Sequence, residues 1–284
     1  MNNVLKRIIV VTGANKGIGY GVIKTLAAQL NLDIIIMTSR NSQLGQNARN
    51  EIIASIQGND LENRLIYLQL DITDIKSREI FINFLIEKYK KIDVLVNNAG
   101  VAKKGDEFNT SVFDFTLQTN FFSTIDFTEE ILKNNLISNT GKIINVASSL
   151  GKLNCIKSEK IKQEFLSNSL TVDNLNDLCN RYRKAIDKNL IESEGWSNSC
   201  YAFSKVCLNF YTKILGKRND ILEKNIQVFS CCPGWVRTDM GGPNAFRSLE
   251  EGVICPVYLI NLPHQMNNDL QGNFFYDSKV TSIV

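Results

Sequence analysis

The chain has 284 residues, 44% of them hydrophobic, and a formal net charge of +3 at pH 7. This length suits one large α/β domain or two small ones, and the apolar fraction argues against disorder. The basic residues are scattered rather than clustered, so nothing favours a nucleic acid or a membrane surface as a partner.

Cysteine and histidine usage narrows the chemistry. Seven cysteines, an odd number, show no C-x-x-C spacing and read as free thiols of a reducing compartment. The single histidine, His264, is expected in a loop or at the surface, so Ser-His-Asp hydrolysis and a metal site find little support. The N-terminal apolar run is too short for a signal peptide, and no run of about 18 apolar residues follows. We therefore expect a soluble, cytoplasmic protein without a metal.

Seven short apolar runs alternate with stretches of helical periodicity. The runs are residues 5–11, 33–38, 64–70, 92–96, 142–147, 225–231 and 272–276. Apolar strands joined by crossovers of helical length are typical of a parallel sheet that helices cover on both faces. The pattern predicts an α/β fold with a doubly wound, seven-stranded parallel sheet of the Rossmann type. No linker or repeat interrupts residues 1–284, so we expect a single domain.

One crossover departs from this rhythm. Residues 151–200, which follow the fifth strand, are much longer than the neighbouring connections. Within them, residues 161–190 have helical periodicity, and either Thr171 or Asp173 suits an N-cap. The segment is expected to be an inserted helical subdomain.

A glycine-rich loop connects the first strand to the first helix. The sequence TGANKGIG, residues 12–19, places Gly13, Gly17 and Gly19 where a backbone can turn tightly and approach a pyrophosphate at a helix N-terminus. Its spacing differs from G-x-G-x-x-G, so the strand-turn-helix context carries the interpretation. The alternative is an ordinary tight turn.

The end of the second strand favours a phosphorylated cofactor. An NAD enzyme needs an acidic side chain there to bind the ribose 2′-hydroxyl. Asp33 lies at the start of that strand, whereas Arg40 follows its end and Lys16 adds a cation from the glycine loop. Two cations and no carboxylate suit a 2′-phosphate, so we predict NADP(H). The alternative is that both cations are merely solvated.

Two further strand ends supply candidate cofactor contacts. QLDITD closes the third strand and places Asp71 and Ile72 near an adenine. NNAG closes the fourth strand, where Asn97, Ala99 and Gly100 would let a cofactor approach the backbone. Either segment taken alone could be a set of turn residues.

The segment YAFSK puts Tyr201 and Lys205 on the same face of one helical turn. A tyrosine with a pKa of about 10 is poorly matched to proton transfer at neutral pH, and a nearby cation favours its phenolate. Such a pair also occurs by chance in many helices, so the remaining motifs decide its meaning.

Taken together, the motifs TGANKGIG, NNAG, YAFSK and PGWVRTDM, with a serine after the fifth strand, resemble the short-chain dehydrogenase/reductase family. NKGIG, DVLVNNAG, TNFF, EGW, CCPGWVRTDM and EEG with PVYL are similar to its cytosolic monomeric carbonyl reductases. The resemblance runs nearly end to end. It implies NADPH-dependent reduction of quinones, aldehydes and ketones to alcohols or hydroquinones. Because the insertion is similar to one that covers the family's dimerisation face, it also implies a monomer.

The resemblance implies a catalytic set of four residues. Tyr201 would protonate the carbonyl oxygen as hydride arrives from the nicotinamide, and Lys205 would favour the phenolate and hold the ribose hydroxyls. Ser148 would donate to the carbonyl oxygen, and Asn120 would hold a water that links Lys205 to solvent. The expected cofactor contacts are Gly13, Asn15, Lys16, Gly17, Ile18, Gly19, Arg40, Asp71, Ile72, Asn97, Ala99, Gly100, Tyr201, Lys205, Pro233, Gly234, Val236 and Thr238.

Ser148, Leu150, Trp235 and Met240 are the expected substrate contacts. An aromatic and a soft apolar side chain suit flat, lipophilic carbonyl compounds. The alternative for Trp235 is packing in the core. Two alternatives to a broad carbonyl reductase stay open: a reductase or alcohol dehydrogenase of one metabolite, and a sensor that binds NADP(H) without turnover.

Overall fold

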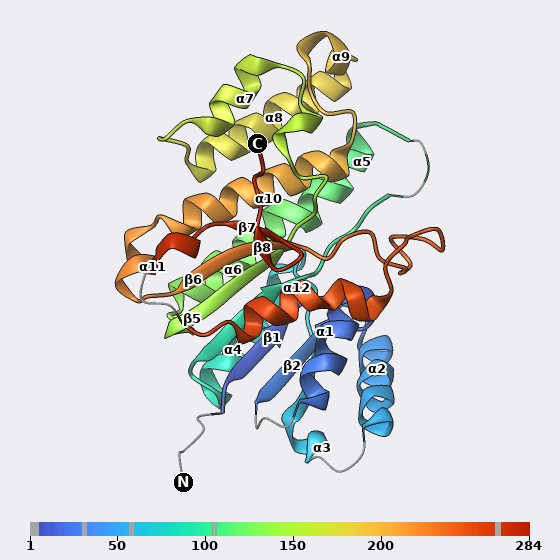
Figure 1. Ribbon diagram of the computed structural model, residues 1–284, viewed down its shortest axis with the longest axis vertical. Coiled ribbons are helices and arrows are strands. Elements are labelled where there is room, and N and C mark those ends of the chain that lie inside the picture. The colour runs from blue at the N-terminus through green and yellow to red at the C-terminus, as the bar shows by residue number, and fades with distance from the viewer. Residues whose placement is uncertain (1–5, 30–32, 57–59, 104, 106, 265–267) are drawn as a thin grey trace.

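The computed structural model describes residues 6–29, 33–56, 60–103, 105, 107–264 and 268–284 (Figure 1). Its strands are β1 (Ile8–Val11), β2 (Ile34–Ser39), β3 (Leu65–Gln69), β4 (Ile92–Asn97), β5 (Ile137–Val146), β6 (Gln227–Cys232), β7 (Phe274–Tyr276) and β8 (Lys279–Val280). They form one sheet in the order β3-β2-β1-β4-β5-β6-β7-β8. Every neighbouring pair through β7 is parallel. The predicted doubly wound sheet is therefore confirmed.

The predicted count of seven strands omits β8. This strand runs antiparallel to β7. The turn between them uses Asp277 and Ser278, with φ of 50° and 58°. Positive φ at both central residues is what a tight hairpin turn requires. A strand of two residues carries too little alternation to be recognised in a sequence.

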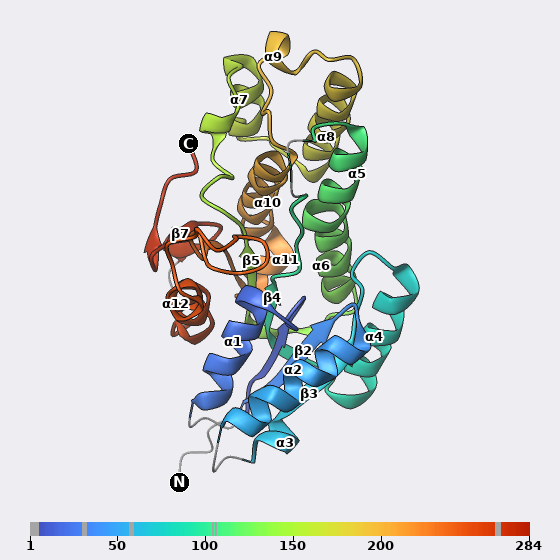
Figure 2. The same cartoon turned by 90° about the vertical axis from the view of Figure 1, so that its right-hand side faces the viewer.

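Helices cover both faces of the sheet (Figure 2). They are α1 (Gly17–Ala28), α2 (Ser42–Ser55), α3 (Leu61–Arg64), α4 (Ile75–Lys88), α5 (Thr110–Leu117), η1 (Gln118–Phe122), α6 (Ser123–Lys133), η2 (Leu153–Cys155), α7 (Glu159–Leu166), α8 (Val172–Asp187), α9 (Ile191–Glu194), α10 (Cys200–Gly216), α11 (Asn219–Glu223), α12 (Leu249–Asn261) and η3 (Asn268–Leu270). No described helix is both long and apolar enough to span a bilayer.

Alternate strand residues feed two separate cores, as the two-residue period of a strand requires. Ile9 and Val11 of β1 pack with α1, α2 and α12, whereas Val10 packs with α4, α5, α6 and α10. Because both faces of each strand are buried, the strand sequences are continuously apolar rather than alternating.

The long crossover after β5 contains α7, α8 and α9, which lie beyond the end of the sheet (Figure 1). Of the two candidate N-caps, Thr171 is the one used: its hydroxyl accepts from the Asn174 backbone N–H at 3.2 Å in a capping box. Tyr182 fixes α8 to α10, because its ring centroid lies 4.1 Å from that of Phe203. Its hydroxyl donates to the Ser197 carbonyl at 2.8 Å.

Candidate active site

The candidate site lies where β1, β4, β5 and β6 end together at one edge of the sheet. These four strands are neighbours and run in parallel, so the segments that follow them meet. The chain order of the strands reverses between β1 and β4, which is where a ligand crevice forms in a doubly wound sheet.

The glycine loop after β1 uses backbone conformations that favour glycine. Gly13 and Gly17 have φ of 62° and 57°. A Cβ atom at Gly13 would lie 2.8 Å from the Ala99 Cα, and one at Gly19 would lie 2.5 Å from the Asn98 Nδ2. The loop therefore packs directly on the segment after β4, which the small residues of NNAG make possible.

The first turn of α1 suits an anion. Lys16 is the N-cap of this helix, and its side chain makes no capping hydrogen bond. The backbone N–H groups of the first turn are therefore left for another acceptor, and the helix dipole favours a phosphate there. Asn15 and Ile18 stay partly exposed beside this turn.

Two residues outside the predicted set hold the loop together. The Thr12 hydroxyl accepts from the backbone N–H groups of Asn98 and Ala99, each at 3.0 Å. Asn98 in turn donates from Nδ2 to the carbonyls of Thr12 at 2.8 Å and Gly13 at 3.0 Å. Thr12 lies in TGANKGIG and Asn98 lies in NNAG. A polar side chain next to the glycines of each motif was therefore the signal that could have identified these two residues.

Several predicted cofactor contacts have buried side chains, Asn97 and Ile72 among them. Asn97 donates from Nδ2 to Thr128 at 2.9 Å and to Asn145 at 2.8 Å, and so braces β4 against α6 and β5. Ile72 is also buried. A cofactor contact at Asn97 would therefore involve its backbone. The Asp71 carboxylate, which is partly exposed, accepts from the Thr73 backbone N–H at 2.9 Å and from its hydroxyl at 2.7 Å.

Tyr201 and Lys205 lie in the first turns of α10, which begins after the N-cap Ser199. The Lys205 Nζ is 5.8 Å from the centroid of the Tyr201 ring. Burial raises the pKa of Tyr201 to about 12, and a hydrogen bond with Ser148 opposes that rise. At neutral pH Tyr201 therefore holds a proton that it can donate, and Ser148, two residues after the end of β5, lies beside it.

The Lys205 ammonium is buried without a carboxylate partner in the described part of the chain. Its Nζ donates to the Val146 carbonyl at 2.8 Å, and burial lowers its pKa to about 8. An ammonium has three donors. With one of them used on this carbonyl, the others are suited to hydroxyl groups of a bound molecule.

Asn120 occupies η1, a π-helical turn between α5 and α6. Such widened turns are frequent at functional sites. Its Oδ1 accepts from the Val101 N–H at 2.7 Å, and its Nδ2 donates to the Ser204 hydroxyl at 3.1 Å. A Cβ atom at Gly100 would lie 3.3 Å from that Oδ1 and 3.7 Å from the Lys205 Nζ. Asn120 and Lys205 thus converge on Gly100.

The two predicted phosphate-binding cations are both exposed, but their surroundings differ. Arg40 follows β2 with an exposed side chain. Lys16, by contrast, pairs with Asp239 at 2.8 Å, the two side chains being 66% and 74% exposed. Asp33 lies at the far end of β2, as its sequence position predicted, and accepts from the Arg7 guanidinium at 3.1 Å.

The segment after β6 lies against the glycine loop. A Cβ atom at Gly17 would be 3.6 Å from the Thr238 Cγ2, and one at Gly252 would be 2.5 Å from the Val236 Cγ2. The segment bends at Gly234, with φ of 85°. The Pro233 carbonyl before that bend accepts from Arg247 at 3.4 Å.

The predicted substrate contacts on two loops are exposed. Trp235, Met240 and Leu150 are 50%, 46% and 59% exposed. The alternative that Trp235 packs in the core is therefore wrong. Leu150 is tied to the catalytic region because its backbone N–H donates to the Ser148 hydroxyl at 3.1 Å.

Comparison with known proteins decides the family. A model of the short chain dehydrogenase family matches residues 7–158. Carbonyl reductase (NADPH) 1 of Mus musculus is 36% identical over 280 residues, which cover 96% of this chain and 97% of that protein. The chain belongs to the short-chain dehydrogenase/reductase family.

Two solved structures of enzymes resemble this short-chain dehydrogenase/reductase closely. Salutaridine reductase from Papaver somniferum superposes with a TM-score of 0.81 at 29% identity, covering 96% of this chain and 100% of that one. Menthone neomenthol reductase from Mentha piperita gives a TM-score of 0.81 at 25% identity, covering 96% and 99% of the two chains.

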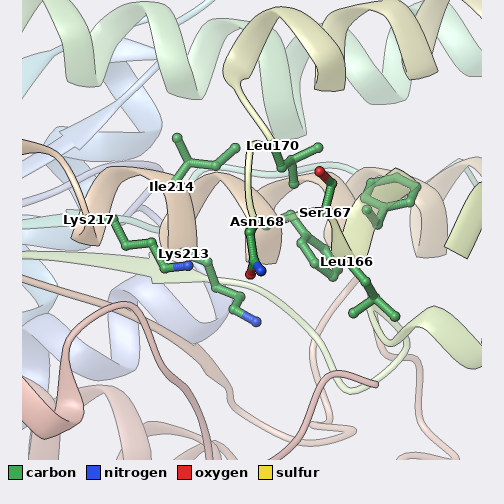
Figure 3. Close-up of a pocket in the computed structure, with 9 residues that line it drawn as sticks. Leu166, Ser167, Asn168, Leu170, Lys213, Ile214 and Lys217 are labelled. Carbon is green, nitrogen blue, oxygen red and sulfur yellow. The ribbon is translucent and has the colours of Figure 1, made fainter. Parts of the chain in front are cut away.

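The protein has a separate small cavity that lies away from the catalytic residues. It has a volume of about 120 Å³ and is lined by the α7–α8 connection and the last turns of α10, with Lys213 and Lys217 at one side (Figure 3). Lys213 follows Tyr201 on α10 by about 18 Å at a rise of about 1.5 Å per residue. This cavity is therefore not part of the candidate site.

Proposed function

We propose that the protein uses NADPH to reduce quinones, aldehydes and ketones to hydroquinones or alcohols. The observation that carries this proposal is the meeting of Tyr201, Ser148 and Lys205 at the crevice between the two halves of the sheet. Tyr201 is protonated at neutral pH, Ser148 lies close enough to it to oppose the rise of its pKa, and Lys205 is a buried cation. Such a set can deliver one proton to an oxygen on which negative charge develops.

The residues of this chain fit an NADP(H) molecule. The uncapped first turn of α1 would hold its pyrophosphate, Lys205 would hold the nicotinamide ribose, and Arg40 would contact the 2′-phosphate. When bound, the cofactor supplies the hydride. The named NADPH enzyme at 36% identity over 96% of this chain supports the same choice.

Each catalytic residue then has one task in the reaction. Tyr201 donates its proton to the substrate oxygen, so that proton and hydride together convert C=O into CH–OH. Ser148 donates a hydrogen bond to the same oxygen and helps to fix its position. Lys205 favours the phenolate that remains, because its positive charge lies close to the ring. Asn120, beside Lys205, would hold the water from which the phenolate is reprotonated.

The test is NADPH consumption with menadione and a set of small aldehydes, with NADH as control. Replacing Tyr201→Phe removes the proton but keeps the ring, so we expect turnover to fall by about 10²–10⁴-fold while NADPH still binds. Equal turnover by the two proteins would overturn the assignment. Binding of NADPH without turnover of any carbonyl would indicate a sensor, and one dominant ketone would indicate a narrow reductase.

We also propose that the protein is a monomer. In much of the family, two long helices, one of which carries the catalytic pair, contact a neighbouring subunit. Here α8 packs on both α5 and α10: Tyr182 lies 5.7 Å from Phe113 and 4.1 Å from Phe203 between ring centroids. Arg183 pairs with Asp114 at 2.7 Å. Light scattering should give a mass near 32.0 kDa, whereas about twice that mass would refute the proposal.

A single-domain organisation and a cytoplasmic location complete the proposal. Seven free cysteines support a reducing compartment. Calorimetry should show one cooperative transition for the whole chain, including the insertion, and cell fractionation should find the protein in the cytosol. Two separated transitions, or a membrane or organelle fraction, would contradict the respective statement.

A further inference from the structure

Two aromatic side chains stand exposed next to each other on the segment after β6. Trp235 is 50% exposed and Phe246 is 64% exposed. Their ring centroids are 6.1 Å apart and their planes are nearly perpendicular, at 82°. Contiguous exposed apolar surface, unlike single scattered apolar residues, is typical of a binding site.

Backbone and ionic contacts fix this pair in place. The Trp235 indole N–H donates to the Gly241 carbonyl at 2.8 Å, and the Arg247 N–H donates to the Trp235 carbonyl at 3.1 Å. Arg247 is itself held by Asp277 at 2.7 Å, and its guanidinium lies 5.8 Å from the centroid of the Phe246 ring. The rings are therefore held in position before a ligand arrives, which lowers the entropic cost of binding.

The pair is connected to the catalytic residues through the end of β6. Lys205 donates to the Val146 carbonyl at 2.8 Å, and Val146 of β5 pairs with Cys231 of β6, the residue before Cys232. The Cys232 Sγ accepts from the Gly234 N–H at 3.2 Å, and Trp235 is the next residue. The chain therefore leads from the strand end beside the Lys205 contact directly to Trp235, whose ring neighbours that of Phe246.

We propose that Phe246 is a specificity-determining residue, which extends the Trp235 wall outward and selects carbonyl compounds with several fused aromatic rings. The proposal rests on the proposed reductase function. A small carbonyl compound without rings has no flat apolar surface to place against the two aromatic side chains. A fused-ring compound covers both aromatic side chains and removes their exposed surface from water.

Two vicinal diketones with the same reacting group separate these cases. They are 9,10-phenanthrenequinone, with three fused rings, and 2,3-butanedione, with none. We expect Phe246→Ala to lower kcat/KM for the quinone by about tenfold, mainly through KM, because an aromatic contact is lost. Its kcat/KM for butanedione and its Kd for NADPH should stay within about twofold of the wild type. Phe246→Leu keeps an apolar side chain, so its kcat/KM for the quinone should lie between those of the wild type and Phe246→Ala.

The matched control is Tyr258→Ala, which removes another exposed aromatic side chain, 40% exposed, from the outer surface of α12. It should leave the preference between the two diketones unchanged. An unchanged preference in Phe246→Ala, an equal loss for both diketones, or the same loss in Tyr258→Ala would overturn the proposal. If the wild-type protein reduces neither diketone, the proposed broad reductase function fails, and the two failures are thus distinguishable.

Discussion

Two regions of the molecule are built in opposite ways: the buried catalytic residues, called the floor of the crevice here, and the exposed aromatic pair, called its outer wall. Asn120, Ser148 and Lys205 on the floor are at most 9% exposed, and hydrogen bonds fix all three. Trp235 and Phe246 on the wall are at least half exposed and leave ring surface open to solvent. Proton transfer needs polar groups whose positions do not change, whereas selection among substrates needs apolar surface that a ligand can cover. Substitutions on the floor should therefore lower the turnover of every substrate, and substitutions on the wall should lower the turnover of some substrates only.

The largest effect is expected for Lys205→Ala. Removal of the cation beside Tyr201 should lower kcat by about 10²–10⁴-fold, for large and small carbonyl compounds alike. The fold should persist, because a buried ammonium without a carboxylate partner stabilises it little. NADPH oxidation measures the first effect and a urea titration the second. Lys213→Ala on the same helix is the matched control. A loss of turnover confined to one size of substrate would contradict the distinction between floor and wall.

A second substitution on the floor should act on stability. Asn120→Ala removes the bonds that its amide makes with Val101 and Ser204, and leaves buried polar groups without partners. We expect the free energy of unfolding to fall by about 3 kcal/mol. On the wall, Phe246→Ala should change it by no more than about 0.5 kcal/mol. Equal effects in urea titrations of the two variants would remove the distinction between floor and wall.

The pH dependence of turnover should report the floor as well. Lys205 loses its charge as the pH rises through its pKa of about 8. Because the charged form favours the phenolate left after proton donation, kcat/KM for NADPH should be level below that pH. Above it, kcat/KM should fall by about tenfold per pH unit. Lys205→Arg keeps its charge to far higher pH, so its profile should lack this decline. A decline shared by both proteins would exclude Lys205 as its cause.

The sequence predicted the floor better than the wall. The glycine loop is a strand-turn-helix motif, and Tyr201 and Lys205 lie one turn apart on one helix. Both arrangements are local, so they could be inferred without a structure. The same holds for the seven parallel strands, whose apolar runs are continuous. No local sequence pattern indicates the π-helical turn at Asn120. Its side chain instead bonds to Val101 and Ser204, which are distant in the sequence.

The wall depends on contacts between distant segments. Phe246 lies in a stretch without periodicity, and its place beside Trp235 follows from the path of the chain to Arg247, which Asp277 holds from the β7–β8 turn. That turn leads into β8, the strand that the sequence did not predict. The partner of Lys16 was missed for the same reason, since Asp239 lies 223 residues away in the sequence.

The smallest expected effect concerns the ion pair between Lys16 of the glycine loop and Asp239 of the segment after β6 that also carries the wall. Both side chains are mostly exposed, so the pair contributes at most about 1 kcal/mol and can be exchanged for another anion. Asp239→Asn leaves Lys16 without this carboxylate, and NADPH should then bind up to about fivefold more tightly, because the 2′-phosphate no longer competes with it. The affinity for NADH, which lacks that phosphate, should not change. Fluorescence titrations of the wild type, Asp239→Asn and the double variant with Lys16→Ala measure these differences. If the double variant retained the gain, Lys16 would not be the group that Asp239 holds away from the phosphate.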